Sequence, residues 1–264
     1  MLKLSTKVTR DISYNPPAVS RGVGDLFLPD KVAGHPVLLI HGGGWNALTK
    51  ESIEPLARWL ADHGRAVFSI NYRLLDHSPW PACGDDCIAA GRFMLDGKLA
   101  SHDLPAPTKI LIAGASAGGH LAMMTGLGLP AGTVEAMVSL AGPSLIDFPD
   151  GSSSQLGSDT FHRRFFGTPA QPTSEQIEAV SPAKLAKPGV PPLYCIHSTN
   201  DQLVKPTHSE LAAAAWRRVK SRARVITFNG AGDSHGFWDS ENHAIRRPIP
   251  EVVNALDVVL KELA

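Results

Sequence analysis

The sequence predicts an α/β fold in which a mostly parallel central sheet is covered by helices on both faces. Short apolar runs alternate with stretches of helical periodicity along most of the chain, as in parallel strands joined by crossover helices. The runs are largely continuous, which is expected of strands that are buried on both faces. Each unusual motif follows directly after such a run, and parallel sheets gather their functional groups at the carboxyl ends of their strands.

The predicted strands differ between the N-terminus and the rest of the chain. Residues 8–14 and 24–28 have the pattern of two short strands, separated by a turn region that contains Pro-Pro and Arg-Gly. Residues 36–40 and 66–70 are continuous apolar runs and are therefore predicted to be buried strands. Further buried strands are predicted, in chain order, at residues 110–113, 136–140, 193–197 and 225–228.

Helices are predicted where apolar residues recur at helical spacing between these strands. Ser52 is expected to cap the first helix, and Gly64 is expected to end it. A second helix is predicted at about residues 85–95, a third directly after Ser116, and a terminal one from Pro250 onward. Three apolar faces support these predictions: Ile53, Leu56, Trp59 and Leu60; Leu211, Ala215, Trp216 and Val219; and Val252, Leu256, Val259 and Leu263.

The bulk composition excludes several classes of partner. The chain has 25 Lys and Arg against 25 Asp and Glu, and no charged tract, so neither nucleic acid nor an anionic membrane is expected as partner. Its 264 residues fit one α/β domain, which we expect to span residues 1–264. No signal peptide or membrane-spanning run is visible, so a cytoplasmic location is expected.

The three cysteines predict neither a disulfide framework nor a metal site. Cys195 lies in an apolar, strand-like run and is expected to be a buried thiol. Cys83 and Cys87 lie four residues apart near a helix start, but no further ligands are close to them in the sequence. We therefore interpret them as ordinary thiols and expect no metal and no cofactor.

A long irregular insertion interrupts the alternation of strands and helices. Residues 143–190 are rich in Pro, Gly and Ser, and contain one predicted helix at about residues 174–180. Long insertions in compact domains are more often functional than idle. Residues 143–190 are therefore a candidate lid or substrate-pocket wall.

The motif G-x-S-x-G, residues 114–118, lies between a predicted strand and a predicted helix. A pattern this short occurs often by chance, so by itself it also fits a turn without chemistry. A strand that turns sharply into a helix would place the Ser116 hydroxyl at the helix N-terminus. The helix dipole and free N–H groups favour negative charge there, which is the setting of a nucleophile.

A serine hydroxyl needs a base, which is usually a histidine that is oriented by a carboxylate. Among the 11 histidines, we select His235 because it lies in a loop of small residues after the last sheet strand. For the acid we select Asp201, which follows the preceding strand. Asp233 is the competitor, but at two residues from His235 it is poorly placed to face the Nδ1 atom. Three other histidines are expected to pack or to support these loops: His41, His120 and His197.

The glycine run at residues 42–44 follows a buried strand and precedes Trp45. Acyl transfer forms an oxyanion, which backbone N–H donors can stabilise, and glycines can turn such donors inward because no Cβ obstructs them. We assign Gly43 and Gly44 as donors, together with Ala117 at the start of the helix that follows Ser116.

In chain order the motifs are His41-Gly-Gly-Gly-Trp45, Asn71-Tyr-Arg-Leu74, Gly114-Ala-Ser-Ala-Gly-Gly-His-Leu-Ala122, Ser181-Pro182, His197-x-x-x-Asp201 and His235-Gly236. From about Gly24 onward, the chain resembles the α/β-hydrolase-fold serine esterases. The nearest group is the hormone-sensitive-lipase-like carboxylesterases, especially their short feruloyl-esterase-like and kynurenine-formamidase-like branch. The resemblance implies the α/β-hydrolase fold, a triad at Ser116, Asp201 and His235, and an oxyanion hole at Gly43, Gly44 and Ala117. The chain departs from the family in its short region before the glycine run and in Ser198, where the family usually has glycine.

The function expected from these residues is the hydrolysis of carboxylic esters through an acyl-enzyme, with a small-molecule ester as partner. A homodimer is compatible with the sequence. One alternative is an arylformamidase that hydrolyses N-formylkynurenine-type amides; another is a non-catalytic protein of this fold that binds a small ligand. Six aromatic residues are candidates for lining the substrate pocket, although each also fits ordinary core packing: Trp45, Tyr72, Phe165, Phe166, Phe237 and Trp238.

Overall fold

A computed structural model of the chain describes residues 5–147, 158–230, 235, 238–239 and 247–264. Within them, eight strands form one sheet, and each coincides with a predicted strand. The strands are β1 (Thr6–Ser13), β2 (Val23–Pro29), β3 (Val37–Ile40), β4 (Val67–Ile70), β5 (Ile110–Ala115), β6 (Val134–Leu140), β7 (Leu193–Ser198) and β8 (Ala223–Phe228). Their order across the sheet is β1-β2-β4-β3-β5-β6-β7-β8. The first two pairings are antiparallel, and all pairings from β4 to β8 are parallel, so the predicted mostly parallel sheet is confirmed.

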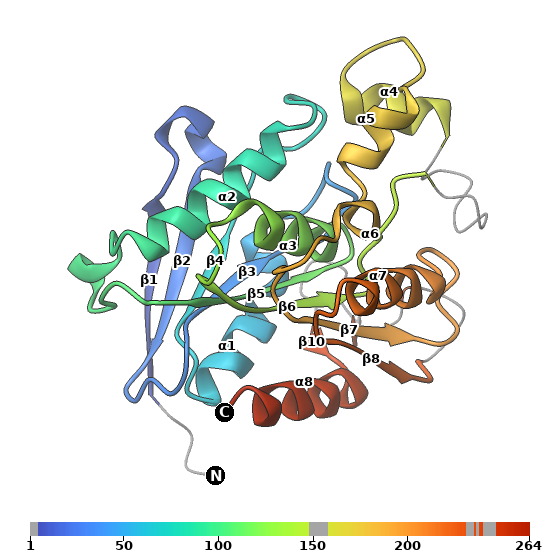
Figure 1. The fold of residues 1–264 in the computed structure, drawn as a ribbon. Coiled ribbons are helices and arrows are strands. Elements are labelled where there is room, and N and C mark those ends of the chain that lie inside the picture. The colour runs from blue at the N-terminus through green and yellow to red at the C-terminus, as the bar shows by residue number, and fades with distance from the viewer. Residues whose placement is uncertain (1–4, 148–157, 231–234, 236–237, 240–246) are drawn as a thin grey trace.

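Helices cover both faces of the sheet, as Figure 1 shows. The larger helices are α1 (Glu54–Asp62), α2 (Ala82–Leu95), α3 (Ala117–Gly128), α7 (Thr207–Arg218) and α8 (Pro250–Glu262). On β3, Leu38 and Ile40 pack into the core beneath α2, α3 and α7, whereas Val37 and Leu39 pack into the core beneath α1 and α8. Successive side chains of a strand point to opposite faces, so this short apolar strand contributes to both cores.

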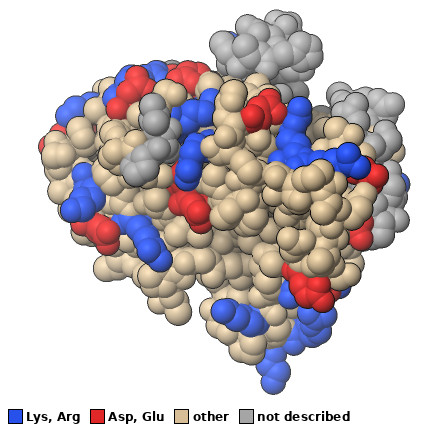
Figure 2. Space-filling view, turned by 90° about the horizontal axis from the view of Figure 1, so that it is seen from above, with Lys and Arg blue, Asp and Glu red and all other residues tan. Residues whose placement is uncertain are grey.

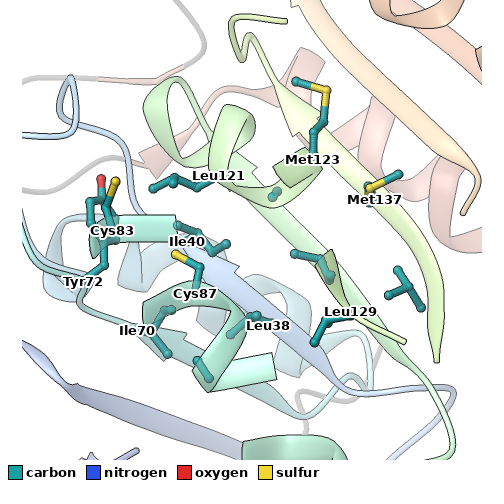
Figure 3. Packing of buried hydrophobic residues seen from close by; sticks show 14 of the residues in the cluster. Leu38, Ile40, Ile70, Tyr72, Cys83, Cys87, Leu121, Met123, Leu129 and Met137 are labelled. Carbon is teal, nitrogen blue, oxygen red and sulfur yellow. The ribbon is translucent and has the colours of Figure 1, made fainter. Parts of the chain in front are cut away.

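The core beneath α2 and α3 contains two of the three cysteines. Figure 3 shows Cys83 and Cys87 of α2 beside Ile40, Ile70 and Tyr72. Both thiols are fully buried, and burial raises the pKa of Cys83 to about 12 and that of Cys87 well above its ordinary value. The two side chains therefore remain neutral and serve as small apolar groups, as expected of ordinary thiols.

Two predicted helix starts are wrong, the first by one residue and the second by about three. Ser52 does not cap α1, because it lies inside a short 3₁₀ helix (Lys50–Ile53) and its Oγ donates to the Thr49 carbonyl at 2.6 Å. The helix predicted from about residue 85 begins at Ala82 instead. In both cases the chain is already turning before the polar residue that was expected to start the helix, and local pattern does not detect such a preceding turn.

The insertion is more helical than its composition indicates. It contains the predicted α5 (Ser174–Ala179), but also α4 (Asp159–Phe166) and α6 (Pro182–Leu185). Ser158 caps α4 by accepting from the Phe161 amide, and the buried rings of Phe161 and Phe165 lie on one face of that helix. In Figure 1, α4 and α5 project from the end of the molecule that also carries α6. Two very short strands, β9 (Trp238–Asp239) and β10 (Arg247–Pro248), pair with each other outside the main sheet.

The charged side chains on the surface are mixed in sign, as the equal numbers of basic and acidic residues lead one to expect. On the face shown in Figure 2, basic and acidic side chains lie interspersed around a region of uncharged residues. In the part of the chain that the structure describes, no helix is both long and apolar enough to span a bilayer.

Candidate active site

Ser116 lies at the corner between β5 and α3. Its backbone has φ 55° and ψ −122°, a conformation that residues other than glycine rarely adopt. Ser116 is also the N-cap residue of α3. The Ser116 amide donates to the Leu140 carbonyl of β6 at 2.7 Å, which fixes the turn against the neighbouring strand. Strain of this kind persists only where the surroundings impose it, and it often marks a functional site.

The two glycines of the motif are required by close backbone contacts. A Cβ on Gly114 would lie 2.1 Å from the Gly118 carbonyl oxygen, and one on Gly118 would lie 2.3 Å from the Ile40 carbonyl oxygen. Any other residue at either position would push α3 away from β5 or β3. The G-x-S-x-G spacing therefore describes the turn that holds the serine in its strained position.

Ser116, His235 and Asp201 form one hydrogen-bonded chain, although they come from distant parts of the sequence. His235 Nε2 lies 2.7 Å from Ser116 Oγ, and His235 Nδ1 lies 2.6 Å from Asp201 Oδ2. The imidazole is 13% exposed, and the Asp201 side chain is fully buried. The competitor Asp233 lies outside the described residues.

The carboxylate of Asp201 is held by four donors. Its Oδ1 accepts from the amides of Leu203 and Val204 at 2.9 and 3.0 Å. Its Oδ2 faces His235 and, at 3.3 Å, Nε2 of the buried His197. Burial by itself raises the pKa of Asp201, but the hydrogen bonds from His197 and His235 outweigh it, so the pKa lies well below its usual range. Asp201 is therefore ionised and oriented.

Ser198 links the acid loop to the loop that carries His235. Its Oγ donates to Asn200 Oδ1 at 2.5 Å and accepts from the Gly230 amide at 3.2 Å. Asn200 Nδ2 donates to the Gly230 carbonyl at 2.8 Å. The serine that departs from the usual glycine thus supplies a hydroxyl that holds the two loops together.

The glycine run leaves β3 with consecutive positive φ angles, 104° at Gly43, 58° at Gly44 and 60° at Trp45. A Cβ on Gly43 would lie 2.2 Å from the Ala47 carbonyl oxygen. Among the described residues, no backbone carbonyl accepts from the amide of Gly43, Gly44 or Ala117. All three residues lie just beyond the carboxyl ends of β3 and β5, at the end of the sheet where Ser116 lies.

Asn46 holds the Gly43–Gly44 peptide in place and connects it to helix α4 of the insertion. The carbonyl of Gly43 accepts from the amides of Asn46 and Ala47 at 3.1 and 3.0 Å. With the side-chain amide of Asn46 oriented so that its nitrogen faces Gly43, Nδ2 also donates to this carbonyl at 3.0 Å, and Oδ1 accepts from Arg164 of α4 at 2.5 Å. The sequence analysis did not select Asn46, because nothing in its local pattern sets it apart from other polar loop residues.

His120 joins the glycine loop, the helix after Ser116 and the insertion. Its Nδ1 accepts from Trp45 Nε1 at 3.2 Å, and its Nε2 donates to the Val180 carbonyl at 2.8 Å. The ring is fully buried, and burial lowers the pKa of His120 to about 4. His120 is therefore neutral at physiological pH and packs as expected.

Three of the aromatic candidates for the substrate pocket lie in the interior of the protein. Trp45, Tyr72 and Phe165 are all buried, with at most 1% of each side chain exposed. Trp45 packs edge-on against Phe165, whose ring is stacked on Trp80, and Tyr72 is stacked on His41. These ring contacts join the glycine loop, the segment after β4 and the insertion. Phe166 is half-buried in the same cluster, whereas Phe237 and the side chain of Trp238 lie outside the described residues.

No cluster of three or more His, Cys, Asp or Glu side chains with metal-binding geometry occurs among the residues that the structure describes. His235 contacts both Ser116 and Asp201, and His197 contacts Asp201.

Comparison with known proteins finds that the chain is similar to several esterases. Carboxylesterase NlhH of Mycobacterium tuberculosis is 40% identical over 86 residues, which are 32% of this chain and 26% of that protein. Hormone-sensitive lipase of Mus musculus is 37% identical over 94 residues, 34% of this chain and 12% of that protein. The matched segments thus span about a quarter or less of these two curated relatives.

Solved structures agree on the fold. A truncated carbohydrate esterase from gut microbiota superposes with a TM-score of 0.79 at 20% identity, covering 100% of this chain and 98% of that one. The fold is therefore the α/β-hydrolase fold, and the resemblance to the hormone-sensitive-lipase-like branch is confirmed. The BD-FAE family model matches residues 25–215, which is well over half of the chain, and the chain therefore belongs to the BD-FAE family.

Proposed function

We propose that this protein is a serine hydrolase that cleaves carboxylic esters through an acyl-enzyme, with Ser116 as nucleophile, His235 as base and Asp201 as the orienting acid. The observation that carries the proposal is the hydrogen-bonded chain from Ser116 through His235 to Asp201, with its nucleophile on a strained turn. The carboxylesterase among the relatives supports an ester substrate.

In the first half of the reaction, His235 Nε2 takes the proton of Ser116 Oγ as the oxygen attacks the ester carbonyl. Asp201 accepts from Nδ1, keeps the proton of the neutral imidazole on that atom and stabilises the imidazolium that forms. The imidazolium then gives its proton to the departing alcohol, and the acyl group remains on Ser116.

In the second half, His235 takes a proton from a water molecule, which attacks the acyl-enzyme carbonyl. The proton then returns to Ser116 Oγ as the carboxylic acid leaves. Both halves pass through a tetrahedral oxyanion, for which we propose the amides of Gly43, Gly44 and Ala117 as donors. Removing one such donor typically costs about 3–4 kcal/mol of barrier.

We further propose that residues 143–190 form a lid or pocket wall over this site. Support comes from α4, whose Phe161 and Phe165 pack against Trp45 of the glycine loop. The contact between Arg164 and Asn46 adds a polar tie to the same loop. A segment anchored so close to the glycine run is well placed to shape the substrate space.

Covalent labelling tests the nucleophile directly. An organophosphonate ester should add one phosphonyl group to the wild-type protein at Ser116, detected by intact mass and peptide mapping. Ser116→Ala should lose the label and the hydrolysis of p-nitrophenyl acetate, whereas the exposed Ser101→Ala should retain both. An unlabelled wild type that binds but does not turn over esters would make the protein a ligand-binding module instead.

A substrate comparison separates ester from amide chemistry. In the unlabelled wild-type protein, turnover of phenyl acetate should exceed that of N-formylkynurenine, and phosphonylation of Ser116 should abolish both. The reverse order would assign the same side chains to a formamidase.

A further inference from the structure

Arg21 extends its guanidinium group from the end of a 3₁₀ helix (Pro16–Arg21) to the base of the glycine loop. Its Nε donates to the Tyr72 carbonyl at 2.5 Å, and its Nη2 donates to the Leu48 carbonyl at 2.9 Å. The same Nη2 lies 3.3 Å from Nε2 of His41, the residue that precedes the glycine run. One side chain thus joins three segments that surround the run.

In the described part of the chain, no Asp or Glu lies within ion-pair distance of Arg21, and Glu51 and Asp86 attract its charge only from further away. Burial lowers the pKa of Arg21 from its ordinary value. A half-buried guanidinium that spends its donors on carbonyls and an imidazole gains less stability than one paired with a carboxylate. Stability alone therefore does not explain why an arginine occupies this half-buried position.

The contact with Arg21 selects the tautomer of His41. A guanidinium can only donate, so the Nε2 atom that faces it has to be an acceptor, and the proton of the neutral imidazole lies on Nδ1. That Nδ1 lies 2.7 Å from the Gly42 carbonyl and donates to it. The ring is fully buried and stacked on Tyr72, with centroids 4.3 Å apart, so it cannot turn away.

The Gly42 carbonyl in turn fixes an amide that the proposed mechanism needs. It also accepts from the Tyr72 hydroxyl at 3.2 Å, so two donors hold it in place. The Gly42–Gly43 peptide is trans, so its N–H points away from its carbonyl. Holding the Gly42 carbonyl on the side of His41 and Tyr72 therefore directs the Gly43 N–H to the opposite side.

We propose that Arg21 is a positioning residue for ester hydrolysis: through the Nδ1–H tautomer of His41, it holds the Gly42–Gly43 peptide so that the Gly43 N–H meets the oxyanion. The inference rests on the proposed function of Ser116 and Gly43. Arg21 acts through another residue and needs no contact with the substrate. Its loss leaves the nucleophile, the base and the acid in place and frees the peptide to rotate.

The test compares Arg21→Met with the matched control Arg92→Met, which changes an exposed arginine of α2. Arg21→Met should lower kcat on p-nitrophenyl acetate about ten- to a hundredfold, with KM within about twofold, because the lost interaction is made in the transition state. A trifluoromethyl ketone forms a stable oxyanion on the nucleophile, and its affinity should fall by the same factor as kcat. Arg92→Met should match the wild type in all three quantities.

A second variant covers the case in which Arg21→Met does not fold. Arg21→Lys keeps the charge but lacks the planar fork, so it should show a smaller loss in kcat and ketone affinity together. Wild-type kcat and ketone affinity in either folded variant would overturn the inference. Failure of the proposed function would look different, because Ser116→Ala would then keep its activity while the wild type escaped phosphonylation.

Discussion

His197 Nε2 lies 3.3 Å from Asp201 Oδ2, the same oxygen that His235 Nδ1 approaches to 2.6 Å. Two histidines thus converge on one buried carboxylate. His197 Nε2 also donates to the Val204 carbonyl at 2.8 Å, which fixes its proton on that nitrogen, and its Nδ1 contacts Ser209 Oγ at 2.7 Å. His197 is therefore a rigid donor that holds the acid loop while His235 faces Ser116.

Replacing His197 should weaken catalysis without removing any residue of the proposed triad. His197→Phe keeps a ring of similar size but loses the donor to Asp201 and to the Val204 carbonyl. A hydrogen bond to a charged group is worth about 1.5–3 kcal/mol, so kcat should fall roughly ten- to a hundredfold. Steady-state kinetics below the unfolding transition measure this loss. Ser209→Ala, which touches only the far side of the imidazole, should cost much less; equal losses in both variants would assign His197 a purely structural role.

On the acid side, the pH dependence of activity should reflect the protonation of a single group, His235. Protonated His235 cannot accept the proton of Ser116, so kcat/KM should fall with a slope of one as falling pH protonates the imidazole. Asp201 adds no step there, because its pKa lies well below its usual range and it stays ionised. Initial rates in constant-ionic-strength buffers measure the profile. A profile that stays flat down to the pH at which the protein unfolds contradicts the role of His235.

The buried neutral state of His120 should make stability depend on pH. Its pKa is lowered to about 4, whereas an unfolded histidine titrates near roughly 6.5, so between these values only the unfolded chain binds the proton. The free energy of unfolding should therefore fall as the pH drops from about 6.5 to 4, by at most about 1.4 kcal/mol per unit from this group. Urea unfolding at several pH values measures the slope. His120→Gln can still bond Trp45 and Val180 but cannot be protonated, and its curve should be flatter by that amount; parallel curves would refute the assignment.

The sheet and the hydrogen-bonded chain at Ser116 could be predicted because both depend on local pattern plus one topological rule. The runs that became β3, β5, β7 and β8 are apolar enough to be recognised alone. Once they are parallel, their carboxyl ends meet at one edge, so residues after three of these strands, Ser116, Asp201 and His235, come together. The order of the strands along the chain, and the residues that follow each strand, were therefore enough to predict which side chains meet at Ser116.

The roles of the aromatic residues could not be predicted in the same way. Trp45 and Phe165 are buried against each other because α4 folds back over the glycine loop, and Tyr72 is buried against His41. That packing joins residues 120 positions apart in the chain, and no local pattern encodes it. Arg21 and Asn46 were missed for the same reason, since their partners are carbonyls and an imidazole that only the tertiary fold brings near.

Asp86 should be essential for stability, because it is a fully buried carboxylate whose partners come from two other segments of the chain. It accepts from Arg73 through the backbone amide at 2.8 Å and through the guanidinium at 2.7 Å, and from Asn15 Nδ2 at 2.6 Å. Asp86→Asn keeps the shape but leaves Arg73 without its counter-ion and turns one acceptor into a donor. Breaking a buried ion pair from one side costs about 3–5 kcal/mol, and we expect a loss of that size in urea unfolding. Asp85→Asn, one position earlier and exposed, should cost less than about 1 kcal/mol, so a similar loss in both variants would point to helix α2 rather than to the ion pair.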